Sequence, residues 1–174
     1  MITIRKATIH DVERIIAIGK KTFLETYSEN TPKEAVANFI KKTFNKATLI
    51  AEFADVSIIY HLLYVSDKLV GYSKIVLNVS NDHIERQRIT KLDRFYVLQE
   101  FHGQRLGKEL FDFIVNFTQT QQQQGMWLYV LIENKRAVHF YTKNNFKIVG
   151  YHDFVISETR TNPNHVLFLD NSEL

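Results

Sequence analysis

Cysteine is absent from the 174-residue sequence, and proline and glycine are scarce, with two and six residues. The lack of cysteine excludes disulfides and thiolate chemistry and is compatible with a reducing compartment. The longest apolar stretch, SIIYHLLYV, is shorter than the roughly 20 residues of a membrane-spanning helix. The N-terminal residues lack the apolar segment typical of a signal peptide. We therefore expect a cytoplasmic protein without a membrane partner.

Charge of one sign does not dominate either. Lys and Arg number 22 and Asp and Glu 19, which gives a net charge of +3. Because the basic residues are spread along the chain, we expect a solvated surface and no nucleic-acid partner, although the small positive excess suits an anionic cofactor. The seven histidines show no spacing typical of metal ligands, so we expect no metal site.

The hydrophobic period changes along the chain and separates helices from strands. Strands are expected over residues 1–7, 56–65, 68–78, 88–97, 126–132, 146–156 and 165–170. Helices are expected after a cap at Asp11, after a capping box at Thr31 and Glu34, and over residues 46–55, 105–122 and 134–145. Antiparallel strand runs combined with strand–helix–strand crossovers predict a mixed α/β (α+β) fold. Its mostly antiparallel sheet should have about seven strands and helices on both faces.

The segment FHGQRLGKELFDFI, residues 101–114, reads as a loop that turns into a helix. Leu106 and Leu110 must face the core, so the main-chain amides from Gly103 to Gly107 should point outward, as at an anion site. On its own, a glycine pair before a helix is a weak signal. Arg105 stands where such a loop usually has glycine. We expect it to take a helical conformation, which needs no positive φ.

The segment ENKRAVHFYTKNNF, residues 133–146, contains a second pattern. Asn134 can cap a helix that brings Ala137, Phe140 and Tyr141 close together on one face. Asn145 stands where a left-handed residue would end the helix. Taken alone, this segment is typical of an amphipathic helix with a core tyrosine.

Together the two segments resemble the GNAT superfamily of acyl-CoA-dependent N-acyltransferases, over about residues 55–155. The first family motif, Gln/Arg-x-x-Gly-x-Gly/Ala, is matched by HGQRLG at its last glycine, whereas His102 and Arg105 depart from it. The second motif is Asn-x-x-Ala-x-x-Phe-Tyr-x-Lys-x-Gly-Phe. It is matched at Asn134, Ala137, Phe140, Tyr141, Lys143 and Phe146, with Asn145 in place of glycine.

A closer resemblance, to the PaiA-type polyamine (spermidine) N-acetyltransferases, covers most of the chain. It rests on the stretches KTFLETYSENTPKEA, LDRFYV and MWLYVLIENKRAVHFYTKNNF. The resemblance implies a single domain with the GNAT fold over residues 1–174, with a substrate-side helical arm over 8–55 and an acetyl-CoA-binding core over 56–155. It implies transfer of an acetyl group from acetyl-CoA to a small-molecule primary amine by direct attack. A homodimer is left open.

The resemblance also implies which residues hold the cofactor. The pantetheine arm should lie beside the strand that ends at Phe95, Tyr96 and Val97. The pyrophosphate should rest on the turn formed by His102, Gly103, Gln104, Arg105, Leu106, Gly107 and Lys108. The Arg105 guanidinium would either grip phosphate oxygens or point into solvent. Asn134, Ala137 and Tyr141 complete the set, with Asn134 bonding the pantetheine amides.

Two residues carry the chemistry that the resemblance implies. Tyr141 would protonate the departing thiolate. Asp93 would hold the substrate ammonium or pass its proton through water, because a carboxylate of ordinary pKa is a poor direct base. The alternative for Asp93 is an ion pair with a nearby arginine.

Acceptor selection is expected from acidic residues in the helical arm and in the loop before the central strand. Glu25 and Glu29, with Asp82 and Glu85, would form an acidic lip for a polycation. Two other functions stay open. One is acetylation of a protein N-terminus or lysine side chain. The other is an acyl-CoA sensor that has lost turnover.

Overall fold

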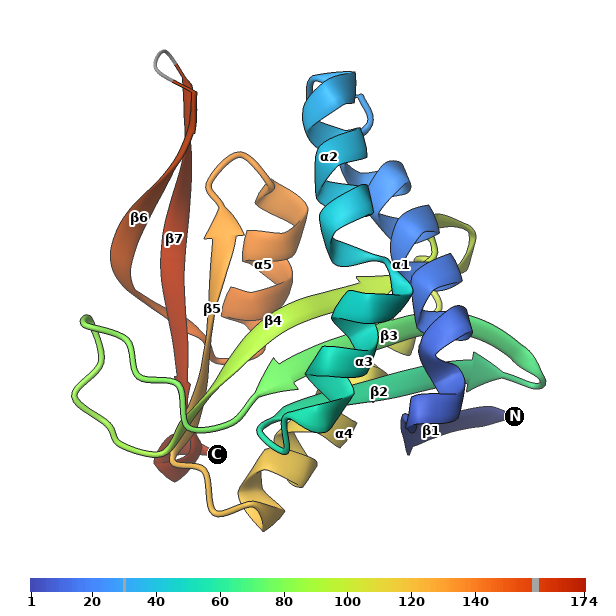
Figure 1. Cartoon of the computed structure of the whole chain (residues 1–174). Coiled ribbons are helices and arrows are strands. Elements are labelled where there is room, and N and C mark those ends of the chain that lie inside the picture. Colours follow the sequence, from blue (N-terminus) through green and yellow to red (C-terminus); the bar gives the residue numbers. More distant parts are fainter. Residues whose placement is uncertain (30, 158–159) are drawn as a thin grey trace. The chain divides into compact units, whose positions relative to one another are not determined.

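The computed structural model describes residues 1–29, 31–157 and 160–174 (Figure 1). Its α-helices are α1 (Val12–Tyr27), α2 (Lys33–Thr43), α3 (Lys46–Ala54), α4 (Leu106–Thr120) and α5 (Lys135–Lys143). Its strands are β1 (Ile2–Lys6), β2 (Ile58–Val65), β3 (Lys68–Val76), β4 (Ile89–Val97), β5 (Gly125–Leu131), β6 (Lys147–Ser157) and β7 (Arg160–Asp170). Short 3-10 helices are η1 (Ile9–Asp11), η2 (Gln99–Phe101) and η3 (Asn171–Glu173).

The strands are hydrogen-bonded in the order β1-β2-β3-β4-β5-β7-β6. The pairs β1–β2, β5–β7 and β7–β6 are antiparallel, whereas β4 and β5 are parallel. A parallel pair needs a crossover connection, which α4 supplies. The predicted mixed fold with a sheet of seven strands is confirmed.

The chain forms two compact units. The first unit comprises Met1–Ile75 and Arg94–Ile114, and the second comprises Val76–Asp93 and Val115–Leu174, so that β4 contributes to both. The expected division into an arm over 8–55 and a core over 56–155 stays a prediction.

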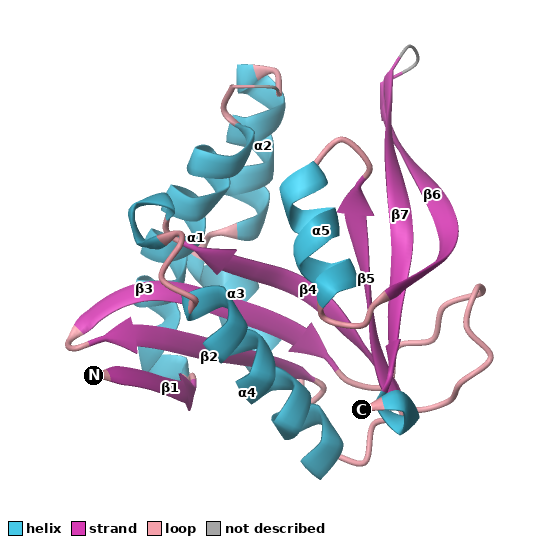
Figure 2. Ribbon diagram, turned by 180° about the vertical axis from the view of Figure 1, so that it is seen from behind, coloured by secondary structure: helices cyan, strands magenta, loops and turns pink. Residues whose placement is uncertain are grey.

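In the first unit, α1 and α3 cover one face of the β2–β3 sheet and α4 covers the other (Figure 2). The core on the α1 side is built mainly from large apolar side chains: Ile15, Ile18, Phe44, Leu49, Tyr60, Leu62 and Tyr72. Gly19 in α1 lies against Phe44, and a Cβ atom there would come within 2.2 Å of the Phe44 ring. The close packing of α1 on this core therefore requires glycine at position 19.

In the second unit, the loop between β3 and β4 covers an apolar patch on the sheet. Ile89, Trp127 and Val166 are buried there, with Val79 and Ile84 of the loop packed against them. The indole Nε1 of Trp127 donates a hydrogen bond to the Val79 carbonyl oxygen at 2.7 Å. This bond satisfies the polar atom of a buried ring and fixes the ring's orientation.

The predicted cap at Thr31 is wrong, whereas Asp11 stands at the predicted cap position of α1 without making the capping hydrogen bond. Thr31 does not cap α2, because Pro32 has an extended ψ of 132° and itself occupies the cap position, so the helix begins at Lys33. Asp11 stands before α1 but makes no capping hydrogen bond to it. Its carboxylate accepts from the Thr8 N–H at 2.9 Å and from Arg5 and Arg14. The Arg5 hydrogen bond in particular holds the pKa of Asp11 well below its usual range, in spite of burial.

Candidate active site

The turn before α4 contains two left-handed residues, Gly103 with φ 82° and Arg105 with φ 61°. The expectation that Arg105 takes a helical conformation is therefore wrong, and the helix begins one residue later, at Leu106. A left-handed conformation costs a residue with a Cβ atom about 1–2 kcal/mol. This cost explains why glycine is the usual residue at such a position.

The main-chain amides of this turn have no recorded partner among the residues that the structure describes. Lys108 N and Glu109 N both donate to the Arg105 carbonyl oxygen, at 2.9 and 3.2 Å. In the described part of the chain, no hydrogen bond is recorded from the N–H groups of residues 103–107. An ideal Cβ atom built on Gly103 would meet no atom within 4 Å, so this side of the turn is open. Partnerless N–H groups at a helix N-terminus suit an anion such as a pyrophosphate.

The end of β4 is tied to this turn. The His102 Nε2–H donates to the Val97 carbonyl oxygen at 2.8 Å, and the Leu98 N–H donates to Val70 O at 2.8 Å. Phe95, Tyr96 and Val97 are half-buried, and Tyr96 stacks on Tyr72 with ring centroids 5.8 Å apart. The His102 side chain therefore links the turn to the end of β4. Its contact with a cofactor stays a prediction.

The side chains of the turn differ in their surroundings. Gln104 and Arg105 are exposed, whereas Leu106 is buried and can meet a ligand only through its backbone. Lys108 pairs with Asp112 one helical turn further on. Cofactor contacts from these residues stay predictions.

At the start of α5 the predicted cap is confirmed. The Asn134 Oδ1 accepts from the Ala137 N–H at 3.1 Å, and Asn145, with φ 68°, follows the helix in a left-handed conformation. Tyr141 is 8% exposed, and its ring packs against those of Phe140 and Phe146 with centroids 5.4 Å away. The core packing of Tyr141 expected for an amphipathic helix is thus present, and its catalytic role stays a prediction.

The parallel ladder between β4 and β5 is short. It pairs Ile89 with Gly125, Thr90 with Met126 and Lys91 with Trp127. In the described structure, no pairing of these two strands is recorded beyond Lys91 and Trp127, although β4 continues to Val97 and β5 to Leu131.

Asp93 lies two residues past that last pair. Its Oδ1 is 2.9 Å from the Lys91 Nζ. An ion pair was one of the predicted alternatives for Asp93, and this partner is lysine rather than arginine. Lys91 also lies over the rings of Trp127 and Tyr129, a contact that the sequence reading missed.

The four acidic residues predicted to form a lip fall in two places. Glu25 on α1 accepts a hydrogen bond from the Gln99 N–H at 2.9 Å, and Glu29, just after α1, is exposed. Asp82 and Glu85 belong to the β3–β4 loop of the second unit and are exposed. The joint role of the four residues stays a prediction.

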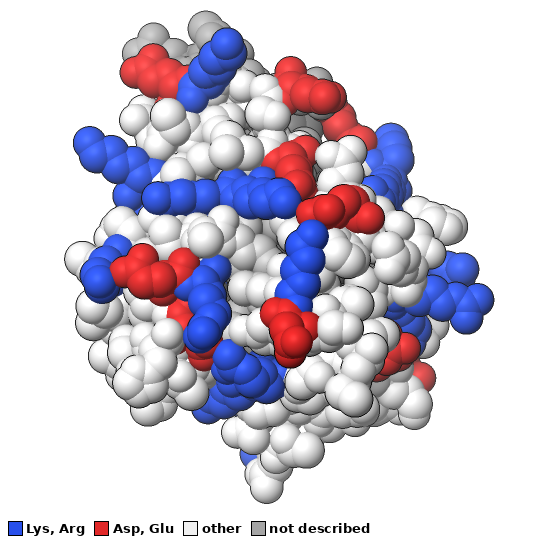
Figure 3. Space-filling view, turned by 90° about the vertical axis from the view of Figure 1, so that its right-hand side faces the viewer, with Lys and Arg blue, Asp and Glu red and all other residues white. Residues whose placement is uncertain are grey.

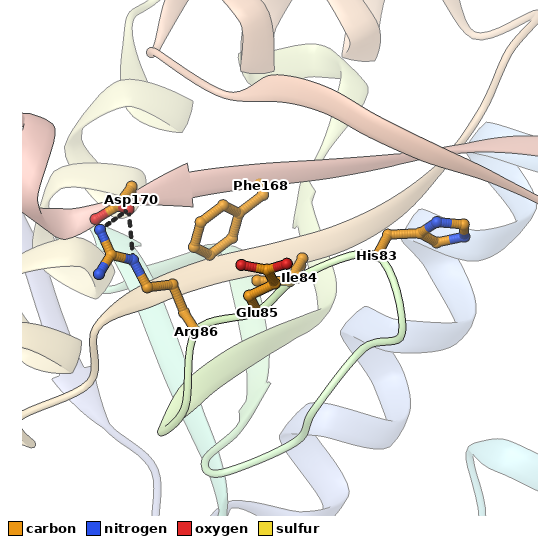
Figure 4. A pocket seen from close by; sticks show the side chains of 6 residues that line it. All are labelled: His83, Ile84, Glu85, Arg86, Phe168 and Asp170. Atoms are coloured by element: carbon orange, nitrogen blue, oxygen red, sulfur yellow. Dashed lines mark hydrogen bonds and ion pairs between the residues drawn. The ribbon is translucent and has the colours of Figure 1, made fainter.

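A hollow of about 460 Å³ lies under this loop, lined by His83, Ile84, Glu85, Arg86, Phe168 and Asp170 (Figure 4). Arg86 reaches Asp170 with Nε and a terminal nitrogen, each at 2.9 Å, while His83 points away from them. His83 instead lies over Gly150, where a Cβ atom would come within 2.4 Å of the ring. The Arg86–Asp170 ion pair thus borders one end of the hollow, and Glu85 is an acidic group that lines it.

The first unit holds a buried ionic cluster that the sequence reading also missed. Lys74 Nζ lies 2.7 Å from Glu52 Oε1, and Arg94 donates to the Tyr60 hydroxyl at 2.7 Å. The Tyr60 hydroxyl in turn donates to Glu52, and burial raises the pKa of Tyr60 above its usual value. A lysine inside the apolar strand β3 was the signal for this cluster, since a buried lysine requires a paired carboxylate.

On the face shown in Figure 3, Asp and Glu side chains stand among the Lys and Arg side chains, several of which form a short row across the upper part of the view. Over the described ranges, no group of three or more His, Asp or Glu side chains comes close enough to hold a metal ion. Among the same residues, no helix is long and apolar enough to cross a membrane.

Comparison with known proteins gives consistent matches. Residues 57–148 match the family described as an acetyltransferase (GNAT) domain. An uncharacterized N-acetyltransferase of Lactobacillus delbrueckii subsp. lactis is 28% identical over 86% of this chain and 87% of its own. A spermidine N(1)-acetyltransferase of Thermoplasma acidophilum is 25% identical over 84% of this chain and 89% of its own.

Among solved structures, the fold is similar to that of the PaiA N-acetyltransferase of Thermoplasma acidophilum in complex with coenzyme A. The TM-score is 0.78 at 21% sequence identity, over 98% of this chain and 99% of the other.

Proposed function

The chain belongs to the GNAT family and is an acetyl-CoA-dependent N-acetyltransferase, and on that premise we propose that its acceptor is a primary amine of a polyamine or a similar small amine. The observation that carries the cofactor part of this proposal is the turn before α4. Its amides from Gly103 to Gly107 have no recorded partner in the described residues, and the turn opens to solvent at Gly103. Such a turn can receive the pyrophosphate of acetyl-CoA.

Each side chain then has a proposed role. The Arg105 guanidinium grips phosphate oxygens as a charged clamp, and Asn134 bonds the pantetheine amides while it caps α5. The backbone of Phe95, Tyr96 and Val97 holds the pantetheine arm. His102, Gln104, Leu106, Lys108 and Ala137 shape the rest of the cofactor site.

Acetyl transfer has three requirements: the amine must lose a proton, the thioester carbonyl must be polarised, and the thiolate must leave. The amine nitrogen attacks the thioester carbonyl carbon, and the carbon–sulfur bond breaks. The thiolate takes a proton from the Tyr141 hydroxyl, and the proton that the acylated nitrogen loses restores that hydroxyl through solvent. Asp93 holds the acceptor ammonium and passes its proton through water, because an amine with a pKa of about 10.4 is almost fully protonated at neutral pH. Backbone near Val97 donates to the carbonyl oxygen.

The acceptor class rests on two supports. A relative over most of the chain carries the name spermidine N(1)-acetyltransferase, and Asp93 already holds an alkylammonium group, that of Lys91. Glu25 and Glu29 are proposed to draw the polycation. The absence of cysteine suits a cytoplasmic enzyme, which is the location we propose.

Calorimetric titration with acetyl-CoA, followed by a thiol-release assay on spermidine, monoamines and peptides, tests the proposal. We expect acetyl-CoA to bind and spermidine to give the fastest release. Release with peptides alone would replace the polyamine by a protein acceptor. Binding without release on every amine would make the chain a sensor.

Tyr141→Phe tests the proton donor. A thiol of pKa about 8.5 leaves with modest help, so we expect turnover to fall about a hundredfold rather than to vanish. Tyr151→Phe, at a tyrosine that is 64% exposed on β6, is the matched control and should keep full turnover. Equal turnover in the two variants would remove Tyr141 from the mechanism.

A further inference from the structure

Lys91 on β4 lies in a setting built for an ammonium group. Its Nζ is 2.9 Å from Asp93 Oδ1 and 5.7 Å from the ring centroids of both Trp127 and Tyr129. A carboxylate and two aromatic rings within about 6 Å are the groups that attract a cation in proteins. All four residues belong to the second unit.

The aromatic walls of this setting are held in place by the sheet. Trp127 is buried and anchored through its Nε1 to Val79 O, and it is the register partner of Lys91. Tyr129 stands at 86° to the Trp127 indole, with ring centroids 5.1 Å apart. His152 and Phe154 of β6 also pack against Tyr129, with ring centroids 5.0 and 5.1 Å away. The rings therefore keep their positions without any help from Lys91.

Lys91 itself is not held so firmly. Its side chain is 28% exposed, while that of Asp93 is 21% exposed. A lysine side chain at such a position gains rotamer freedom when it moves into water. An arriving ammonium that takes its place makes a new ion pair with the Asp93 carboxylate in exchange for the one that Lys91 gives up.

The lysine side chain is an aminobutyl group, and it has the same chemistry as the end of a polyamine. We propose that Asp93, Trp127 and Tyr129 form an ammonium subsite for the acceptor, and that Lys91 occupies this subsite until an acceptor ammonium displaces it. Lys91 is thus an internal competitor that sets acceptor affinity. This inference rests on the proposed function, because it takes the acceptor to be an alkylamine.

Lys91→Met tests the inference, because methionine keeps an apolar stem over the rings and removes the competing charge. The probe is spermidine, titrated by calorimetry into the protein without acetyl-CoA and followed by steady-state kinetics. We expect the spermidine Kd and KM to fall about tenfold, with kcat within about twofold of the wild type. Acetyl-CoA affinity should be unchanged, which also shows that the variant is folded.

The matched control is Lys147→Met. Lys147 lies in the same unit and pairs with Glu173 at 2.6 Å, so this variant makes the same change in net charge and also breaks one ion pair. We expect it to leave spermidine affinity unchanged. An equal gain in both variants would overturn the proposal, since net charge alone would then explain the effect.

A second variant, Tyr129→Leu, removes one aromatic wall. In the Lys91→Met background, this second change should weaken spermidine binding by about threefold or more. Spermidine binding to Lys91→Met that equals or falls below wild-type binding, with acetyl-CoA binding intact, would overturn the inference. The proposed function fails on a different result, which is a wild-type protein that releases no thiol with any amine.

Discussion

The helices α4 and α5 begin in opposite ways. At α5, the Asn134 side chain accepts from the Ala137 N–H. At α4, the preceding residue is a left-handed arginine, and in the described structure no side chain is recorded to accept from the first-turn amides. A side-chain cap is worth about 1 kcal/mol to a helix, so α4 forgoes a stabilisation that α5 has.

The buried face of α4 supplies the stability that its first turn lacks. Leu106, Leu110 and Ile114 are at most 3% exposed, and Phe113 packs edge-on against His61 of β2, with ring centroids 5.4 Å apart. The comparison teaches that packing can hold a helix while leaving its N-terminal amides for a ligand. At a capped helix start, as in α5, the cap side chain occupies a first-turn amide, so a ligand there would bind through the cap residue itself.

The largest expected effect concerns the packing beneath α4. Burial, together with the charge of Lys6, lowers the pKa of His61 to about 4 from the ordinary 6.5. Between these values the unfolded chain binds a proton that the folded chain does not, so stability falls as pH falls. Acidification from pH 7.5 to 4 should therefore cost about 3 kcal/mol of the free energy of unfolding through His61.

Urea unfolding followed by circular dichroism at both pH values measures this loss. His61→Gln, which can still bond Ser73, should lose about 3 kcal/mol less over the same window. Asp11 adds little to this loss. Because folding lowers its pKa, the stability that Asp11 contributes is lost mainly at pH values below its ordinary pKa of 3.8. If the free energy of unfolding depends on pH in the same way in the variant and the wild type, His61 is not the cause of the loss at low pH.

Arg105→Gly addresses the open turn of α4. Glycine accepts the observed φ of 61°, so the free energy of unfolding should rise by about 1 kcal/mol. Loss of the guanidinium should nevertheless weaken coenzyme A binding about tenfold, because charged contacts to phosphate are strong. Chemical denaturation and calorimetry together separate the two effects, and undiminished binding would show that Arg105 points into solvent.

Asn134→Ala addresses the capped start of α5 and should cost about 1 kcal/mol of stability. Asn134→Asp keeps a capping oxygen but loses the amide donor, so it should retain stability and bind coenzyme A about fivefold more weakly. Asn45→Ala, at the α3 cap where Oδ1 accepts from Thr48 N at 2.9 Å, is the control. It should lose similar stability and no affinity.

The smallest effect is expected at the other end of α5. Asn145→Gly relieves a left-handed residue with φ 68° and should stabilise the protein by about 0.5 kcal/mol. Coenzyme A affinity should stay at the wild-type value, which makes this variant the control for Arg105→Gly. A drop in affinity would mean that glycine at any left-handed site disturbs the fold.

The sequence predicted the features that depend on near neighbours. The order of helices and strands, the cap at Asn134 and the left-handed end at Asn145 all follow from residues three or four positions apart. The predictions that failed are the capping hydrogen bonds of Thr31 and Asp11 and the helical conformation of Arg105. Each of these residues is also compatible with a second local structure. Pro32 and the Arg5–Asp11 pair settled the first two, and the carbonyl of Arg105, which accepts from Lys108 and Glu109, settled the third.

By itself the amino-acid sequence determined the fold class, the positions of the helices and strands, and the family, because periodicity and motif spacing are properties of adjacent residues. Only the tertiary structure decided that Lys91 would meet Trp127 and Tyr129. Lys91 and Trp127 are far apart along the chain and become neighbours when the α4 crossover brings β5 alongside β4 in one particular register. That register is set by the packing of whole strands, which no short stretch of sequence encodes.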